Sequence, residues 1–304
     1  GGVLNIGTFP LLSSVIPKNA KYRMRQVSGE AAIRGMNTAV LWSPFFVSFA
    51  VGQLYLPSQS AWLGIAFGLL VALLFNLISI RFLIGKFTLS YLFEAVSCVK
   101  PIFPRLLILS LSVLAVGQIF DKTALNAIVI VIPILVVVQM LRRPETAKSI
   151  ISNLNNLILK SGDEMLLISV SMFLGSILSG SVEIQTFISN NIGNNFPFWA
   201  MIILLPLIVW IFGLIGIHPI ITSAPILSLF GPLLSLWEAA FLMQAHLIGW
   251  CAGTATSFTS LSVLTTAENF RLSVLKLVFG PNLIATGSLT VIGALLLIAL
   301  NYFL

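Results

Sequence analysis

Long apolar runs that are nearly free of charge constrain this chain more than any other feature. Several reach about 18 residues or more, the length that an α-helix needs to cross the hydrocarbon core of a bilayer. Only 8% of the 304 residues are charged, against about 25% in soluble globular proteins. So few charges cannot cover a water-facing surface, which excludes a soluble enzyme, and the high hydrophobicity excludes a disordered chain. The sequence predicts an all-α, polytopic membrane protein.

The apolar runs predict eight spanning segments. Trp42-Ser43-Pro44 should kink the first of them, because proline breaks the helical hydrogen-bond ladder. Polar connectors are expected at 18–34, 81–105 and 142–163, and the last carries apolar residues at helical spacing, typical of an interfacial helix. The predicted spans are about 36–56, 61–80, 106–120, 124–141, 164–180, 197–217, 237–267 and 281–304.

Three stretches depart from simple spans. Two are rich in glycine and hydroxyl residues, Gly7–Val15 and Gly253–Ser260, and each predicts a helix broken by unwound backbone. The third, His218–Ser235, is apolar but holds three prolines, which disfavour one straight helix. For this third stretch we expect a re-entrant hairpin of two half-length helices.

Basic residues predict the orientation, since cytoplasmic loops carry an excess of Lys and Arg. The three polar connectors hold 13 of the 16 basic residues, and Lys122, Arg271 and Lys276 fall on the opposite side. If His218–Ser235 crossed the membrane instead of re-entering, the distribution would become 15 to 1. The expected location is the cytoplasmic (inner) membrane, with the three connectors facing the cytoplasm.

The two broken helices are weakly similar in sequence, since the first is followed by Tyr22-Arg23 and the second by Phe270-Arg271. With a re-entrant hairpin before the second break, the two would run in opposite directions, which is an inverted-topology repeat. In this the chain resembles the ion transporter superfamily of divalent-anion/sodium symporters, arsenite permeases and membrane subunits of tripartite dicarboxylate transporters. The resemblance covers about 1–49 and 199–304. It implies that substrate binds between hairpin tips and helix breaks.

This resemblance divides the chain into three parts. Residues 1–60 are the remainder of a first repeat, 61–196 are scaffold spans and interfacial connectors, and 197–304 are the second repeat. The first hairpin would precede Gly1, so we expect an N-terminally truncated chain. The Ser-Asn-Thr signature of the divalent-anion symporters is absent, which leaves the specific family open.

The candidate binding residues lie in the breaks and the hairpin, where unwound carbonyls and hydroxyls suit Na⁺ and half-helix N-termini attract anions. For each residue the alternative is close helix packing, which Ser and Thr also mediate. For His218 the alternative is a neutral ring bonded to a freed carbonyl. The predicted substrate- or ion-binding residues are Asn5, Thr8, His218, Thr222, Ser223, Thr254, Thr256, Ser257 and Thr259.

These features predict a secondary transporter that moves a small anionic or polar solute, such as a carboxylate, coupled to Na⁺ or H⁺. A channel-like or structural subunit of a larger transport complex is the open alternative. We expect no enzyme, because His218 and His246 have no partnering carboxylate, and no metal site, because Cys98 and Cys251 match no metal spacing. We expect no cofactor beyond Na⁺ as coupling ion. The expected partners are the solute, the lipid bilayer and a second copy in a homodimer, with no nucleic acid.

Overall fold

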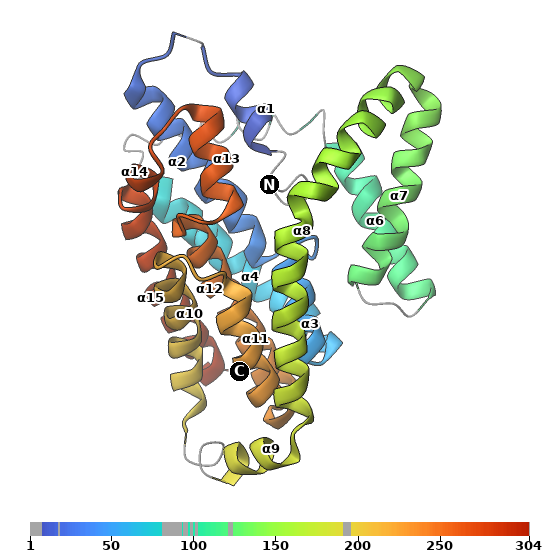
Figure 1. Ribbon diagram of the computed structural model, residues 1–304. Coiled ribbons are helices and arrows are strands. Elements are labelled where there is room, and N and C mark those ends of the chain that lie inside the picture. The colour runs from blue at the N-terminus through green and yellow to red at the C-terminus, as the bar shows by residue number, and fades with distance from the viewer. Residues whose placement is uncertain are drawn as a thin grey trace. The chain divides into compact units, whose positions relative to one another are not determined.

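The computed structural model describes residues 8–17, 19–80, 93, 97, 100, 103–120, 124–190 and 196–303. Its regular structure in these ranges is helical, and no strand occurs in them (Figure 1). This confirms the all-α prediction. The chain forms two compact units, one of Gly1–Phe87 with Leu174–Leu304 and one of Thr88–Phe173.

The first unit contains most of the helices. They are α1 Thr8–Ser14, α2 Tyr22–Thr38, α3 Val47–Tyr55, α4 Ser58–Ser79, α9 Val182–Ile188, α10 Phe198–Leu214, α11 Pro219–Phe230, α12 Leu236–Thr256, α13 Leu261–Phe270, α14 Val274–Val278 and α15 Pro281–Phe303, with the short 3₁₀ turns η2 Ala39–Leu41 and η5 Gly231–Leu233. In the second unit α6 Phe103–Ile119 packs against α7 Ala124–Arg142. Helix α8, Pro144–Gly180, continues from the second unit into the first.

Helix α12 is the core of the first unit. It packs against α10, α15, α4, α2, α3 and α11, and nearly all of its residues from Ala239 onward are buried. A capping box starts it, because the Ser235 side chain accepts from the Glu238 N–H while the Glu238 carboxylate accepts from the Ser235 N–H. A helix that is apolar on all sides is stable in such a central position.

Two helical stretches are long and apolar enough to cross a membrane, Leu236–Phe270 and Val274–Phe303. A third arises if Ile168–Gly180 and Val182–Ile188, bent by 74° at their junction, count as one span. These lengths and compositions, found in the described ranges, indicate a membrane protein. Other apolar helices there have 10–17 residues, so the predicted number of eight spans stays a prediction.

The polar connectors differ from their prediction. Residues 22–34 are not a loop but the first part of α2, which packs against α13. The segment 144–163 and the expected span that follows it form the single helix α8. The predicted interruption at Trp42-Ser43-Pro44 is confirmed, because η2 ends at Leu41 and α3 starts only at Val47.

The expected hairpin of two half-length helices in 218–235 was wrong. One helix, α11, runs through Pro225, and η5 follows it. Pro219 occupies the first turn of α11, where its missing N–H breaks no helical bond, and Pro232 comes after the helix has ended. Only Pro225 therefore interrupts the backbone hydrogen bonds of α11. The helix tolerates this because it packs against α10, α12 and α3.

The observed hairpin consists of α10 and α11 instead. Contacts of Gly213 with Gly253, and of Gly249 with Pro206, show that α10 and α12 run in parallel. Helix α11 begins beside Gly253, near the end of α12, and returns to the start of α12, so α10 and α11 are antiparallel (Figure 1). Their connection, residues 215–218, is the tip of this hairpin.

The predicted placement of Arg271 and Lys276 opposite the first connector was also wrong. The Lys276 ammonium lies 5.2 Å from the centre of the Tyr22 ring, and Arg271 lines a pocket with Arg25. The C-terminal ends of α1 and α13 meet at that pocket, whereas the predicted inverted repeat would place them on opposite sides of the membrane. The error came from combining a full crossing of 197–217 with a re-entrant 218–235, whereas α10 and α11 pair as one hairpin that returns the chain to the end where α10 began.

Candidate functional site

The apolar stretch Leu236–Phe270 is interrupted between α12 and α13. Ser257 ends α12 in an extended conformation, and the Ser260 side chain caps α13 by accepting from an N–H of its first turn at 3.3 Å. The Thr254 carbonyl at the end of α12 accepts from the hydroxyls of Ser260 and Ser262 at 2.6 and 2.9 Å. A break within the predicted stretch Gly253–Ser260 is confirmed, but it is shorter than predicted, because α12 continues through Thr256. The serines of the break satisfy part of its unwound backbone.

The tip of the α10–α11 hairpin lies against this break. Gly216 has a φ of +88°, and a Cβ there would lie 2.7 Å from the Phe258 ring, so glycine is required on both counts. The Gly216 carbonyl accepts from the Thr259 hydroxyl at 2.9 Å, and that hydroxyl lies 3.0 Å from the Ser257 hydroxyl. Two irregular stretches that are distant in sequence therefore meet through a direct hydrogen bond.

His218 belongs to the same tip. Its Nδ1 accepts from the Ile220 N–H at 3.3 Å, which caps the start of α11. Its half-buried ring is edge-on to the Trp250 ring of α12, with centroids 5.4 Å apart. The cap requires an unprotonated Nδ1, so the proton of a neutral ring would be on Nε2.

Three other candidate hydroxyls bond within their own helices. Thr222 and Ser223 donate to the Pro219 carbonyl at 3.0 and 2.8 Å, and Thr256 donates to the Ala252 carbonyl at 2.8 Å. This back-bonding is common for Ser and Thr inside helices. Because each hydroxyl has one proton, these side chains have no further hydrogen to give to a solute.

The remaining candidates are divided between α12 and the start of the chain. The Thr254 hydroxyl lies 2.6 Å from the Asn37 side-chain oxygen, which connects the end of α12 with α2. Thr8 begins α1, and its buried hydroxyl has no hydrogen-bond partner in the described part of the chain. Asn5 lies outside the described residues.

A buried ion pair within α2, which is hydrogen-bonded to α15, was not expected from the sequence. Arg34 donates to the Asn282 side-chain oxygen at 2.8 Å and lies 3.8 Å from the Glu30 carboxylate, which accepts from Gln26 at 2.9 Å. Glu30 and Arg34 are only 4% and 5% exposed. Burial lowers the pKa of Arg34, and the neighbouring Glu30 carboxylate opposes that shift.

Helix α12 adds two fully buried polar side chains to this interior. The Gln244 amide, oriented with its nitrogen toward the carbonyls of Gly64 and Leu41, donates to them at 3.0 and 3.1 Å. The His246 Nε2 donates to the Ser48 carbonyl at 2.9 Å, which sets its tautomer and leaves its buried Nδ1 without a partner in the described ranges. Helices α2, α3 and α4 thus each make a polar contact with α12.

One sequence signal could have revealed part of this interior. Gln26, Glu30, Arg34 and Asn37 follow one another at steps of four, four and three residues, which places them along one face of a helix. The first three lie in the stretch 18–34 that was predicted to be a polar connector. Their partner Asn282 carries no such signal, since a lone Asn in an apolar span has no periodicity.

The described residues contain no group of three His, Cys, Asp or Glu side chains that could hold a metal ion. Cys251 is a buried free thiol. Comparison with known proteins found no matching family model, no similar curated protein and no similar solved structure.

Proposed function

We propose that this protein is a multi-pass secondary transporter of the cytoplasmic (inner) membrane that moves a small anionic or polar solute, driven by Na⁺ or H⁺. The observation that carries the proposal is the contact of the α10–α11 tip with the α12–α13 break, where Thr259 donates to Gly216. Irregular backbone at membrane depth is tolerated only inside protein or beside a water-filled site. Transporter sites are built from such broken helices.

Helix lengths support a re-entrant α10–α11 hairpin. At 1.5 Å per residue, the 17 residues of α10 and the 12 of α11 extend about 26 and 18 Å, less than the roughly 30 Å of a hydrocarbon core. Both are apolar, and they return the chain to the end where α10 began. A hairpin that stops partway is the element expected to present its tip to a solute.

The polar interior supports a transport role over a purely structural one. Glu30, Arg34 and Asn282 are buried in a bundle whose outer surface is rich in exposed leucine, isoleucine and phenylalanine. Ionisable groups inside a membrane protein are expensive to bury and typically serve substrate or ion pathways. The Asn37–Thr254 contact connects this interior to the end of α12 at the break.

Solute binding would replace the hydrogen bond between Thr259 and Gly216. Opening it would free one hydroxyl donor and one carbonyl acceptor beside His218, close to the N-terminus of α13. A helix N-terminus favours negative charge, so an anionic group is the better ligand for this end. The freed carbonyl provides an oxygen ligand for Na⁺.

The test is uptake into proteoliposomes that contain the full chain, with imposed Na⁺ or proton gradients and labelled phosphate, sulfate or succinate. Thr259→Val removes the hydroxyl of the break that donates to the Gly216 carbonyl, while preserving the side-chain shape. A hydrogen bond to a charged partner contributes about 1.5–3 kcal/mol. The apparent KM of the transported solute should therefore rise roughly 10- to 150-fold.

Thr256→Val is the matched control, because it removes a hydroxyl that already donates to Ala252 inside α12. Its apparent KM should equal that of the parent chain. Equal KM values in both variants would show that the break only serves packing. Flux without coupling to either gradient would favour the channel-like alternative, and absence of uptake for all three solutes would reject the proposal for these anions.

A further inference from the structure

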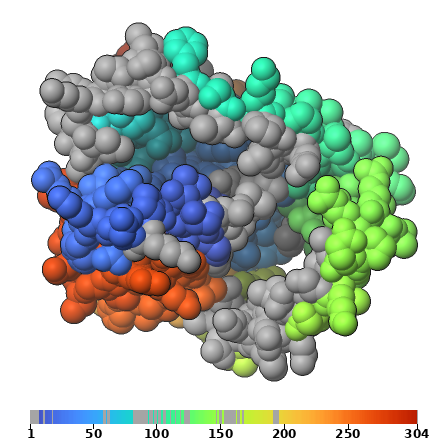
Figure 2. Space-filling view, turned by 90° about the horizontal axis from the view of Figure 1, so that it is seen from above, coloured from blue at the N-terminus to red at the C-terminus, as the bar shows by residue number. Residues whose placement is uncertain are grey.

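A small pocket lies at the end of the first unit where α1, α2 and α13 meet. Figure 2 shows α1 and α2, in blue, beside α13 and α14, in orange-red, at this end. The pocket has a volume of about 130 Å³, well below the 300–1,000 Å³ of sites for drug-sized ligands. Its lining residues are Ser13, Ile16, Pro17, Arg25, Asn269, Phe270 and Arg271.

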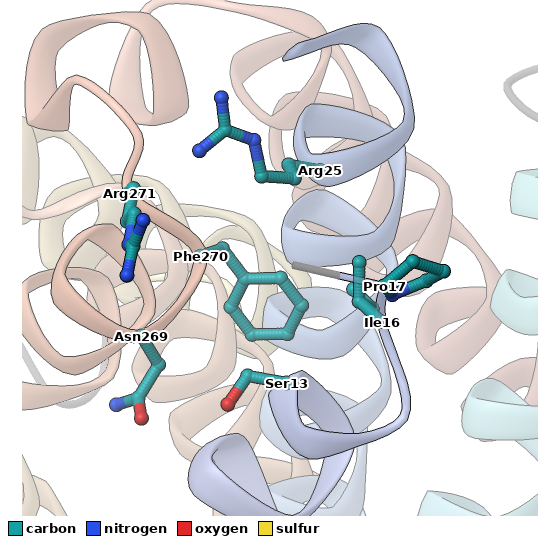
Figure 3. A pocket seen from close by; sticks show the side chains of 7 residues that line it. All are labelled: Ser13, Ile16, Pro17, Arg25, Asn269, Phe270 and Arg271. Carbon is teal, nitrogen blue, oxygen red and sulfur yellow. The ribbon is translucent and has the colours of Figure 1, made fainter. Parts of the chain in front are cut away.

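The lining is cationic and rich in donors. Figure 3 shows the guanidinium groups of Arg25 and Arg271, the Asn269 amide and the Ser13 hydroxyl arranged around the Phe270 ring. No carboxylate lines the pocket as described. The Arg25 Nε is buried and has no hydrogen-bond partner among the described residues. Two guanidinium groups without a counter-charge here favour an anionic ligand.

The backbone at Arg271 is a second observation that points to this site. Arg271 ends α13 with φ 54° and ψ 57°, the only left-handed non-glycine residue in the described ranges. Helices commonly place glycine at this position, because a Cβ is disfavoured there. An arginine held in this unfavourable conformation at the edge of a pocket motivates the hypothesis that its side chain has a function there.

We propose that this pocket binds a small oxyanion of the phosphate or carboxylate type through Arg25 and Arg271. The planar guanidinium donates two parallel hydrogen bonds to such groups. Asn269 provides an additional donor. The volume limits the ligand to an inorganic anion, a short carboxylate or the phosphate of a lipid headgroup. The inference does not depend on transport, because binding is measured at equilibrium.

The competing role of the two arginines is electrostatic support of helix ends. The C-terminal ends of α1 and α13 both lie at this pocket, and their partial negative charge attracts cations. In that role Arg271 would stabilise the fold without any ligand. The two roles predict opposite effects of replacing Arg271 with glycine.

The experiment is calorimetric titration of the full chain in phosphatidylcholine nanodiscs with inorganic phosphate, sulfate and succinate. Arg25→Gln and Arg271→Gly should each raise the Kd of the bound anion at least about tenfold, since each removes charge-assisted hydrogen bonds. Arg271→Gly should also raise the unfolding temperature of the anion-free protein, because it relieves the left-handed residue. Arg23→Gln, an exposed arginine of α2 outside the pocket, is the matched control and should leave the Kd unchanged.

A second arm identifies the source of the anion. Nanodiscs that contain phosphatidylglycerol should compete with free phosphate if a headgroup occupies the pocket, and competition should disappear in Arg25→Gln and Arg271→Gly. The proposal is supported if free phosphate or phosphatidylglycerol binds and if that binding requires both arginines. Three results would overturn it: no anion or anionic lipid binds, binding is unchanged in both pocket variants, or Arg23→Gln weakens binding as much as they do. A lower unfolding temperature in Arg271→Gly, with no effect on binding, would establish the helix-end role.

Discussion

Arg34 and Glu30, both on α2, are buried although both carry charge. Moving a charge out of water costs several kcal/mol, which neighbouring opposite charges and hydrogen bonds must offset. Here the Asn282 oxygen accepts from Arg34 at 2.8 Å, and the Gln26 amide donates to Glu30 at 2.9 Å. Each of these polar groups has a hydrogen-bond or ion-pair partner among the others, so replacing one charged side chain leaves the other buried charge without its partner.

Glu30→Gln should therefore destabilise the protein by about 3–5 kcal/mol, the cost of breaking a buried ion pair from one side. Chemical unfolding in detergent micelles measures the change. The matched control Glu268→Gln alters an exposed carboxylate of α13 and should change stability by no more than about 0.5 kcal/mol. Equal effects of the two substitutions would show that Arg34 does not depend on Glu30.

At the scale of elements, glycines determine how closely α10 and α12 approach. A Cβ at Gly213 would lie 2.8 Å from the Gly253 Cα, and a Cβ at Gly249 would lie 2.8 Å from the Pro206 Cα. Small residues allow such backbone contact in membrane helices, where van der Waals packing replaces the hydrophobic effect. This contact holds α10 parallel to α12 and so places the 215–218 tip beside the break.

Gly249→Ala should destabilise the α10–α12 pair by about 1–3 kcal/mol, because the contacted atoms are backbone and a β-branched side chain that cannot retreat. The same change at Gly35, which has open space around it on α2, should stabilise the protein by roughly 0.5–1 kcal/mol through helix propensity. Unfolding midpoints of the two variants should shift in opposite directions. A shift in the same direction would contradict the close contact.

For the whole molecule, the contacts of Arg271 and Lys276 agree with the side that the charge rule predicts for them. Arg271 and Lys276 lie at the end of the first unit that also holds Arg25 and Tyr22. When these residues are counted with the three polar connectors, the predicted division of the basic residues becomes 15 to 1, which is the stronger asymmetry of the two considered. The contacts thus favour the distribution that the charge rule itself preferred.

Single cysteines test this orientation with an impermeant thiol reagent, after replacement of Cys98 and Cys251 by alanine. Lys21→Cys and Lys276→Cys should both react only after the membrane is permeabilised. Tyr302→Cys, near the far end of the 23-residue helix α15, should react in intact cells. Reaction of Lys276→Cys in intact cells while Lys21→Cys stays protected would reject the shared side.

The sequence by itself determined the helical class and most helix ends. The span expected at 281–304 is observed as Pro281–Phe303, and the one expected at 61–80 as Ser58–Ser79. It also located the break after α12, where Ser260 caps the next helix. These features are local, because apolar run length, a capping serine and a proline in a first turn act within one or two helical turns.

Only the tertiary structure decided which segments meet. Arg34 donates to Asn282, which is 248 residues away in the sequence, and the Thr259 hydroxyl donates to the Gly216 carbonyl. Arg25 shares a pocket with Arg271. Combining a full crossing of 197–217 with a re-entrant 218–235 reversed the direction of everything after them, because apolar run length does not show that the two segments pair as one hairpin. The close backbone contact between α10 and α12 shows that the two helices are parallel, and no periodicity within either helix reports that direction.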